Sequence, residues 1–123
     1  MLGELMILKF MLNDSLQLDH AFAALADPFR RGMLARLSRG PASVSELAQP
    51  LPISLPAVLQ HLKALESSGL VASQKKGRVR TVRLQGGALA EAESWLSQRR
   101  EEWEARVDRF EQHLHTIQSE AKE

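Results

Sequence analysis

Two short helical segments joined by a turn constrain the fold of this chain more than any other part of the sequence. Ser43-Val44-Ser45-Glu46 is a capping box, in which a serine and a glutamate three residues apart satisfy each other's backbone N–H groups at a helix start. Pro50 and Pro52 end that helix early. A second helix begins at Ser54, because serine is a strong N-cap and Pro56 is tolerated in the first turn. Two helices joined so tightly predict a helix-turn-helix.

The second helix, over residues 54–70, has two different faces. At about 100° per residue, Val58, Leu62 and Leu65 form one apolar stripe. The opposite stripe is polar, lacks a carboxylate and consists of Pro56, Gln60, Lys63 and Ser67. Gly69 supplies the left-handed residue that ends the helix. Taken alone, the segment fits an ordinary core helix as well as a helix whose outer face meets a partner.

The next segment predicts a β-hairpin with an unbalanced charge. Residues 70–74 and 78–84 are rich in β-forming residues, and Gly77 between them supports a tight turn. Val82 and Leu84 share a face, which we expect to pack against the helices. The tip and outer edge carry five cations, the hairpin cations Lys75, Lys76, Arg78, Arg80 and Arg83. A charged edge strand is the plainer interpretation, but residues 67–90 contain no acidic residue, which favours phosphate contact.

Positive and negative charges are also distributed unevenly along the whole chain. Residues 1–90 hold eleven Lys and Arg against six Asp and Glu, whereas residues 91–123 hold five against nine. A basic body with an acidic tail predicts that the body meets a polyanion. The length of 123 residues suits one domain, and the absence of cysteine excludes disulfides, thiolate metal sites and cysteine nucleophiles.

We divide the chain into three segments. Residues 1–14 form an apolar extension, too short to span a bilayer and without a cleavage site, so we expect a cytoplasmic protein without a membrane partner. The extension is a helix on the core, a helix on a second subunit, or residues ahead of a later start. Residues 15–87 form the helix-turn-helix and hairpin, with further helices over 15–25 and from an Asp27 cap to a stop at Gly40-Pro41. Gly86-Gly87 is expected to separate them from residues 88–123.

The last segment predicts one long helix with an apolar seam. Apolar residues recur at three-four spacing, and the dimerisation residues among them are Leu96, Trp103, Val107, Phe110 and Leu114. An apolar seam flanked by charges is typical of paired helices, so we expect a homodimer. A helix folded back on its own domain is the alternative. The fold class is therefore mostly α with a small β-hairpin.

With these elements in place, the chain resembles the ArsR-type winged helix-turn-helix transcriptional regulators, in their metal-independent branch. Four stretches carry the resemblance: ALADPFRRGMLARL (24–37), SVSELAQPLPISLPAVLQHLKALESSGLV (43–71), KKGRVRTVRL (75–84) and AESWLSQRREEWEARVDRFEQHL (92–114). The resemblance implies a homodimeric regulator of double-stranded DNA, usually a repressor, with the Ser54 helix in the major groove and a long C-terminal dimerisation helix. Leu59 stands where the family commonly has serine, so the operator sequence cannot be carried over.

The candidate DNA contacts lie on the second helix and the hairpin. They are Ser54, Pro56, Ala57, Gln60, His61, Lys63, Lys75, Lys76, Arg78 and Arg80. Gln pairs with adenine, and Lys with guanine or phosphate. His61 lies on the flank of the helix, where it either reaches a phosphate or packs.

Three other functions are alternatives to DNA binding. A winged helix that binds an acidic protein would use the same cations. A metal-responsive repressor would need ligands from both subunits, because His113 and His115 point to different sides of one helix. We expect neither a metal nor a cofactor, and no enzyme, since the sequence lacks a glycine-rich phosphate loop and an HExxH motif. The pattern leaves room for a small-molecule inducer, for example near Trp95 and Trp103.

Overall fold

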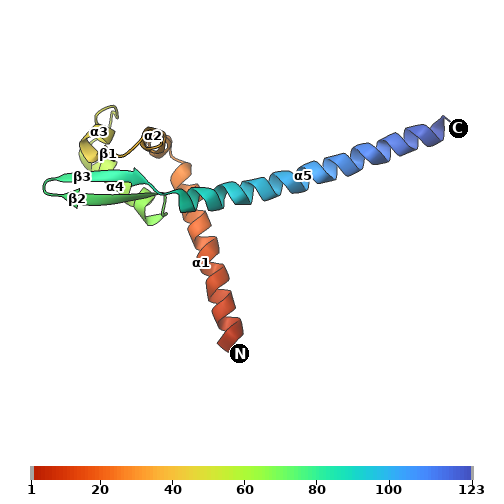
Figure 1. Ribbon diagram of the computed structural model, residues 1–123, viewed down its shortest axis with the longest axis horizontal. Coiled ribbons are helices and arrows are strands. Elements are labelled where there is room, and N and C mark those ends of the chain that lie inside the picture. Colours follow the sequence, from red (N-terminus) through yellow and green to blue (C-terminus); the bar gives the residue numbers. More distant parts are fainter. Residues whose placement is uncertain (1, 123) are drawn as a thin grey trace. The chain divides into compact units, whose positions relative to one another are not determined.

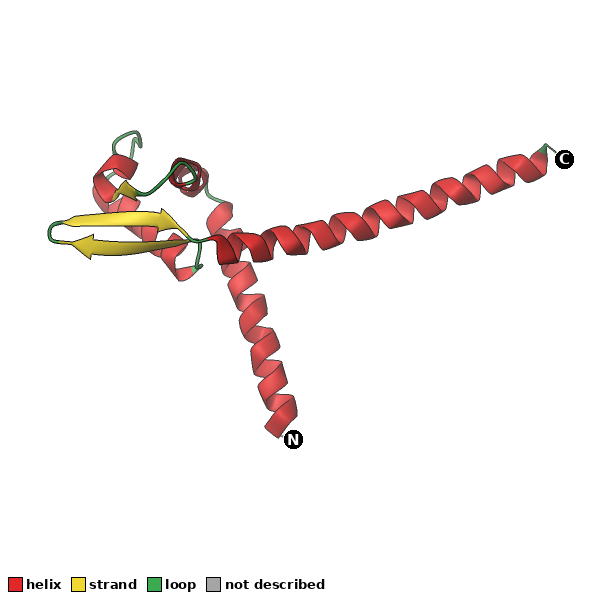
Figure 2. Cartoon of the chain, in the orientation of Figure 1, coloured by secondary structure: helices red, strands yellow, loops and turns green. Residues whose placement is uncertain are grey.

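The computed structural model of the chain describes residues 2–122, except for the side chains of residues 12–15. Its contacts divide the chain into two units, Met1–Ala92 and Glu93–Glu123. In the described residues the elements follow the order α1 (Leu2–Leu25), α2 (Pro28–Leu37), β1 (Ala42–Ser43), α3 (Val44–Ala48), α4 (Leu55–Ser67), β2 (Val71–Lys76), β3 (Val79–Leu84) and α5 (Gly86–Ala121) (Figures 1 and 2).

Helix α1 is longer than expected. It runs from Leu2 to Leu25 without a break, so residue 15 does not begin a helix. The reason lies in the sequence, because residues 4–25 contain neither proline nor glycine. The extension is therefore helical. Its large apolar side chains, such as Leu5, Ile7 and Phe10, are exposed in the single chain.

A side-chain cap starts α2. Asp27 Oδ1 accepts hydrogen bonds from the backbone N–H groups of Phe29 (2.8 Å) and Arg30 (3.1 Å). Pro28 follows as the first helical residue, where its missing N–H costs nothing. The predicted start of this helix is confirmed, whereas its end at Leu37 comes three residues before the predicted stop at Gly40-Pro41.

Only half of the predicted capping box forms at α3. Ser43 Oγ accepts from the Glu46 N–H at 3.1 Å, as predicted. The Glu46 carboxylate instead accepts from Arg36 Nη2 at 3.2 Å. The backbone of Ser43 belongs to β1, where it pairs with Thr81 of β3. A long-range ion pair and a strand pairing thus replace the local reciprocal bond.

Helix α4 has the predicted caps at both ends. Ser54 Oγ accepts from the Ala57 N–H at 3.4 Å. At the other end Gly69 has φ 77°, the Leu70 N–H donates to the Leu65 carbonyl and the Gly69 N–H donates to the Glu66 carbonyl, each at 3.0 Å. These two bonds make a Schellman motif. It turns the chain directly from α4 into β2.

The hairpin is confirmed and gains a third strand. The sheet order is β1-β3-β2, all antiparallel, with Lys76 opposite Val79 at the tip. Gly77 opens the two-residue loop with φ 61°, as a type II′ turn requires of its first residue. Strand β1 was not predicted, since two residues are too few to show a pattern.

The core lies between the helices and one face of the sheet. Its largest fully buried side chains come from α2, α4 and the sheet region: Met33, Val58, Leu65, Leu70, Val71 and Val82. Among the described residues, every buried side-chain nitrogen or oxygen has a hydrogen-bond partner. The predicted apolar stripe of α4 is therefore the part of the helix that packs.

Helix α5 begins before the expected boundary. Gly86 and Gly87 are its first two residues, not a separating linker. Glycine is less costly at a helix start than in its interior, since the first turn lacks intrahelical N–H bonds anyway. In the described part of the chain, no helix is long and apolar enough to cross a membrane.

Two leucines of α4 provide a test of this packing. Leu65→Ala should lower the free energy of unfolding by about 2–5 kcal/mol, because Leu65 is 0% exposed and its loss leaves a cavity. Leu59→Ala, 46% exposed on the same helix, should change it by less than about 0.5 kcal/mol. Urea denaturation of both variants measures the difference. Equal losses would show that α4 packs with another face.

Candidate nucleic-acid interface

The outer face of α4 offers hydrogen-bonding groups without a carboxylate. Pro56, Gln60, Lys63 and Ser67 are all exposed, while Val58 and Leu65 on the opposite side are fully buried. The core therefore fixes which side chains this helix presents. A polar, uncharged-to-basic helix face suits the edges of bases in a major groove.

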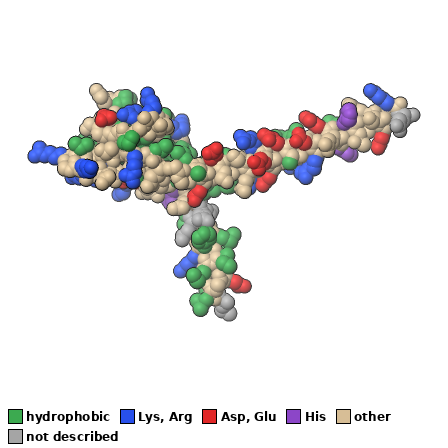
Figure 3. Space-filling view, in the orientation of Figure 1, with side chains coloured by type: hydrophobic (Ala, Val, Ile, Leu, Met, Phe, Trp, Pro, Cys, Tyr) green, Lys and Arg blue, Asp and Glu red, His purple; other side chains and the backbone are tan. Residues whose placement is uncertain are grey.

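Three of the hairpin cations, Lys75, Arg78 and Arg80, lie beside this face. All five side chains are exposed, and Figure 3 shows Lys and Arg side chains around the hairpin end of the first unit. A hollow between the hairpin and the helices is lined by Leu59 of α4, by Lys75, Arg78 and Arg80, and by Ser43 and Ser45. A second hollow is lined by Leu59, Leu62, Lys63, Glu66 and Arg80. Because Leu59 and Arg80 line both, helix and hairpin form one surface.

A chain of hydrogen bonds ties the hairpin to the end of α4. Arg80 Nη1 donates to Ser73 Oγ at 3.3 Å, and Ser73 Oγ donates in turn to the Glu66 carboxylate. Glu66 is the one carboxylate that lines either hollow. The hydrogen bond from Ser73 thus holds the Glu66 carboxylate toward the hairpin.

His61 holds the other flank of α4 against α2. Its Nδ1 accepts from Arg30 Nε at 3.0 Å and lies 3.9 Å from Asp27 Oδ1. Its ring also packs on Phe29, with the centroids 5.9 Å apart. The imidazole is only 18% exposed. Of the two interpretations of His61, these contacts favour packing.

The charge on Asp27 is stabilised where α2 begins. Desolvation raises the pKa of its carboxyl, but hydrogen bonds from the Arg30 and Phe29 N–H groups and the electrostatic effect of the neighbouring His61 and Arg30 side chains outweigh this and lower the pKa below its ordinary value. Asp27 therefore stays ionised at neutral pH and keeps the cap.

Comparison with known proteins identifies the family. A helix-turn-helix domain model matches residues 25–74. The HTH-type transcriptional regulator Rv2034 of Mycobacterium tuberculosis is 47% identical over 72 residues, which cover 58% of this chain and 67% of that protein. The crystal structure of an ArsR family transcriptional regulator is 48% identical, covers 73% of this chain and 93% of its own, and superposes with a TM-score of 0.71. This chain belongs to the ArsR family of winged helix-turn-helix regulators.

Other similar proteins carry related descriptions. A winged helix-turn-helix domain from Mycobacterium bovis, described as homodimeric and as a possible ArsR-family regulator, is 28% identical with a TM-score of 0.57 over 73% of this chain and 83% of its own. Further matches are proteins named as transcriptional repressors in Bacillus subtilis and M. tuberculosis.

The structure separates the predicted DNA contacts of this ArsR-family chain into two sets. Eight of the ten are exposed: Ser54, Pro56, Gln60, Lys63, Lys75, Lys76, Arg78 and Arg80. Ala57 and His61 are half-buried. Sequence reasoning did not find Ser73, Arg30 or the role of Glu66, because their partners lie in other elements and no local motif marks them.

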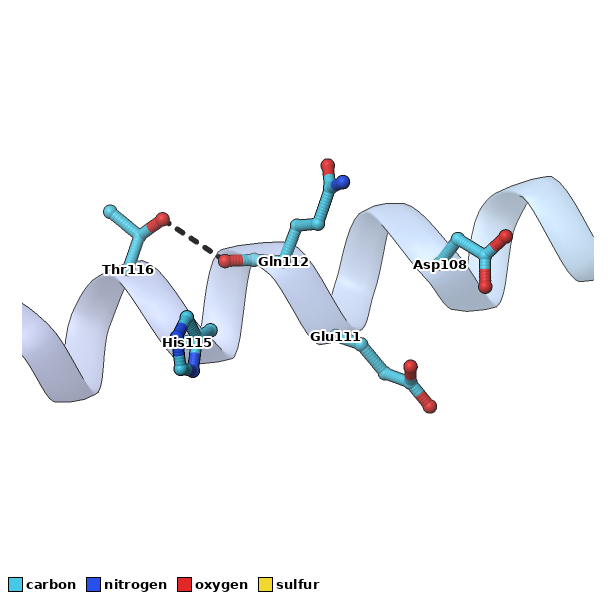
Figure 4. Close-up of a pocket in the computed structure, with 5 residues that line it drawn as sticks. All are labelled: Asp108, Glu111, Gln112, His115 and Thr116. Atoms are coloured by element: carbon cyan, nitrogen blue, oxygen red, sulfur yellow. Dashed lines mark hydrogen bonds between the residues drawn. The ribbon is translucent and has the colours of Figure 1, made fainter.

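His115 of α5 lies near carboxylates that metal ions can use as ligands. Figure 4 shows Asp108, Glu111 and His115 along one side of α5, with Gln112 and Thr116 nearby, and Thr116 Oγ1 donating to the Gln112 carbonyl at 3.0 Å. All these side chains come from a single helix. Among the described residues, no group of three or more His, Asp or Glu is placed to hold a metal ion.

The lowered pKa of Asp27 leads to a pH-dependent difference in stability. A lowered pKa in the folded state means that the ionised cap stabilises the fold above the ordinary value of 3.8, and that this contribution is lost as pH falls through the folded pKa. Asp27→Asn keeps a good N-cap but no charge, so it should be less stable at pH 7. The gap should close below pH 3.8.

Chemical denaturation across pH measures this gap. Asp19→Asn, which removes an exposed carboxylate from α1, is the matched control. A stability difference between wild type and Asp27→Asn that stays constant from neutral to acid pH would contradict this account of the cap.

Proposed function

We propose that the chain is a homodimeric, sequence-specific transcriptional repressor that binds a roughly palindromic site in double-stranded DNA. The observation that carries the proposal is the joint surface of α4 and the hairpin, on which an exposed polar helix face adjoins the hairpin cations Lys75, Arg78 and Arg80. Repression is the activity named for several related proteins. A regulator of this kind acts in the cytoplasm, where its DNA lies.

In this proposal α4 reads bases in the major groove. Gln60 pairs with adenine through its amide, and Lys63 donates to guanine or to a phosphate. Leu59 of α4 is exposed beside the hairpin and contacts a thymine methyl group. The small or rigid residues Ser54, Pro56 and Ala57 at the helix start allow close approach to the groove.

The hairpin supplies charge, not sequence preference. Lys75, Lys76 and Arg78 near the tip neutralise phosphates and make binding dependent on salt. Arg80 contacts the backbone from a fixed position, since Ser73 accepts one of its N–H groups. His61, bonded to Arg30, positions α4 and touches DNA at most through its edge.

A second copy of the chain covers the apolar seam of α5. Trp103 and Phe110 are 65% and 62% exposed in the single chain, and Leu96 and Leu114 are also exposed. Large apolar side chains in a row are stabilised by burial against a partner. Two α4 helices about 34 Å apart, one turn of the duplex, would read the two halves of a palindrome.

Selection of binding sites from random DNA tests the division of labour between helix and hairpin. We expect a palindromic consensus. Gln60→Ala should relax the preference at one base pair of each half-site by about 1–3 kcal/mol. Lys76→Ala and Arg78→Ala should weaken binding to all sequences and lower the salt slope by about one per site. Equal losses of base preference in all three variants would contradict the proposal.

Sedimentation velocity tests the dimer. Phe110→Glu should weaken self-association roughly 100-fold or more, because two buried phenyl rings per dimer are replaced by charges. Gln112→Glu adds the same charge on the opposite side of α5 and should leave the dimer intact. An unchanged dimer in Phe110→Glu would show that another surface joins the subunits.

A further inference from the structure

A groove between α2 and α3 is not used by the proposed DNA surface. It has a volume of about 510 Å³ and is lined by residues of α2, α3 and the turn after it. Met33 and Leu47, both 2% exposed, and the half-buried Leu51 contribute apolar lining. Its size falls in the range of small-molecule sites, about 300–1,000 Å³.

The rim of this groove carries a surplus of positive charge. Arg36 donates through Nη2 to Glu46 Oε2 and through Nη1 to the Gly40 carbonyl, both at 3.2 Å. Arg39 also lines the groove, and within the described residues its guanidinium has no hydrogen-bond or ion-pair partner. Two guanidinium groups thus face one carboxylate.

Gly32 leaves part of the groove wall without a side chain. It lies in the interior of α2, where glycine is less favourable than alanine, and its φ is not positive. A Cβ added there would meet nothing within 4 Å. Neither backbone geometry nor close packing within the chain therefore explains this glycine. It widens the groove at the point where α2 forms its wall.

We infer that the groove between α2 and α3 binds a small amphipathic anion, an apolar chain or ring that bears a carboxylate. The apolar part lies on Met33, Leu47 and Leu51, and the carboxylate accepts from Arg39 and Arg36.

Occupation of the groove would act on the DNA surface, and this step rests on the proposed function. α3 is the first helix of the helix-turn-helix, and the Arg36–Glu46 ion pair braces it against α2. A ligand carboxylate that accepts hydrogen bonds from Arg36 competes with Glu46 and breaks this ion pair between α2 and α3. The ligand therefore lowers affinity for DNA, and by linkage DNA lowers affinity for the ligand by the same factor.

The first arm of the test uses octanoate and the free full-length chain, without DNA. We expect backbone NMR shifts confined to α2, α3 and the following turn, with octanol and octylammonium binding at least tenfold more weakly than octanoate. Arg39→Gln should weaken octanoate about tenfold, whereas Arg83→Gln, which removes an equal charge from β3, should not. Shifts confined to α1 or α5, no binding, or equal binding of the three probes would each overturn the site.

A second variant guards against loss of folding. Gly32→Met should fill the groove, raise the melting temperature and abolish octanoate binding, because open space receives the new side chain. Gly3→Met, in an equally open position on α1, is the control for added apolar surface. Octanoate bound equally by Gly32→Met and wild type would overturn the site.

The second arm measures affinity for the selected DNA site with and without octanoate. A fall in affinity for wild type but not for Gly32→Met is expected, and binding in the groove without such a fall would overturn the regulatory step. Failure of the chain to bind DNA at all would contradict the proposed function while the NMR result still decides the site.

Discussion

The burial of one stripe of α4 is the interaction on which the rest of the structure depends. Val58, Leu62 and Leu65 pack with residues of α2 and the sheet. The opposite stripe of α4 therefore faces outward. The Schellman turn at Gly69 then sends the chain straight into β2, so the hairpin begins where α4 ends. The outer face of the helix and the cations of the hairpin come to share a surface for this reason.

Polar contacts set the orientation that apolar packing leaves loose. His61 and Arg30 join one flank of α4 to α2, while Glu66, Ser73 and Arg80 join the other flank to the hairpin. Because each flank has its own connection, rotation of α4 about its axis would break hydrogen bonds on both sides. The two sets also include two carboxylates, since Asp27 lies 3.9 Å from His61 and Glu66 of α4 accepts from Ser73.

The sequence carried enough information for the helix-turn-helix, the caps and the hairpin, because each has a local signal. Asp27-Pro28, Ser54 and Gly69 mark helix ends through their own backbone chemistry, and the stripe of α4 repeats every three to four residues. Other features depend on distant partners. Strand β1 exists only through its pairing with β3, and Glu46 turns from its predicted local bond to Arg36. Helix α1 is long because no proline or glycine interrupts residues 4–25. The absence of such residues does not by itself predict a helix.

Some residues of the candidate site were likewise predictable from local sequence, and others were not. The exposed residues of α4 and the hairpin were predictable from periodicity and charge, whereas the packed environment of His61 was not, since Phe29 and Arg30 approach it from another helix. The groove between α2 and α3 could not be predicted from the sequence either. Met33 and Arg36 belong to one helix and Leu47 to another, and only the packing of the two helices creates the space between them.

The most direct measurement for the central claim is fluorescence anisotropy of the purified full-length chain on the DNA upstream of its own gene and on a scrambled duplex, across a salt series. We expect tighter binding to the upstream DNA together with a steep fall in affinity as salt rises, since phosphate contacts release counterions. Weak binding that is equal on both duplexes and insensitive to salt would contradict the account of α4 and the hairpin as a DNA-reading surface.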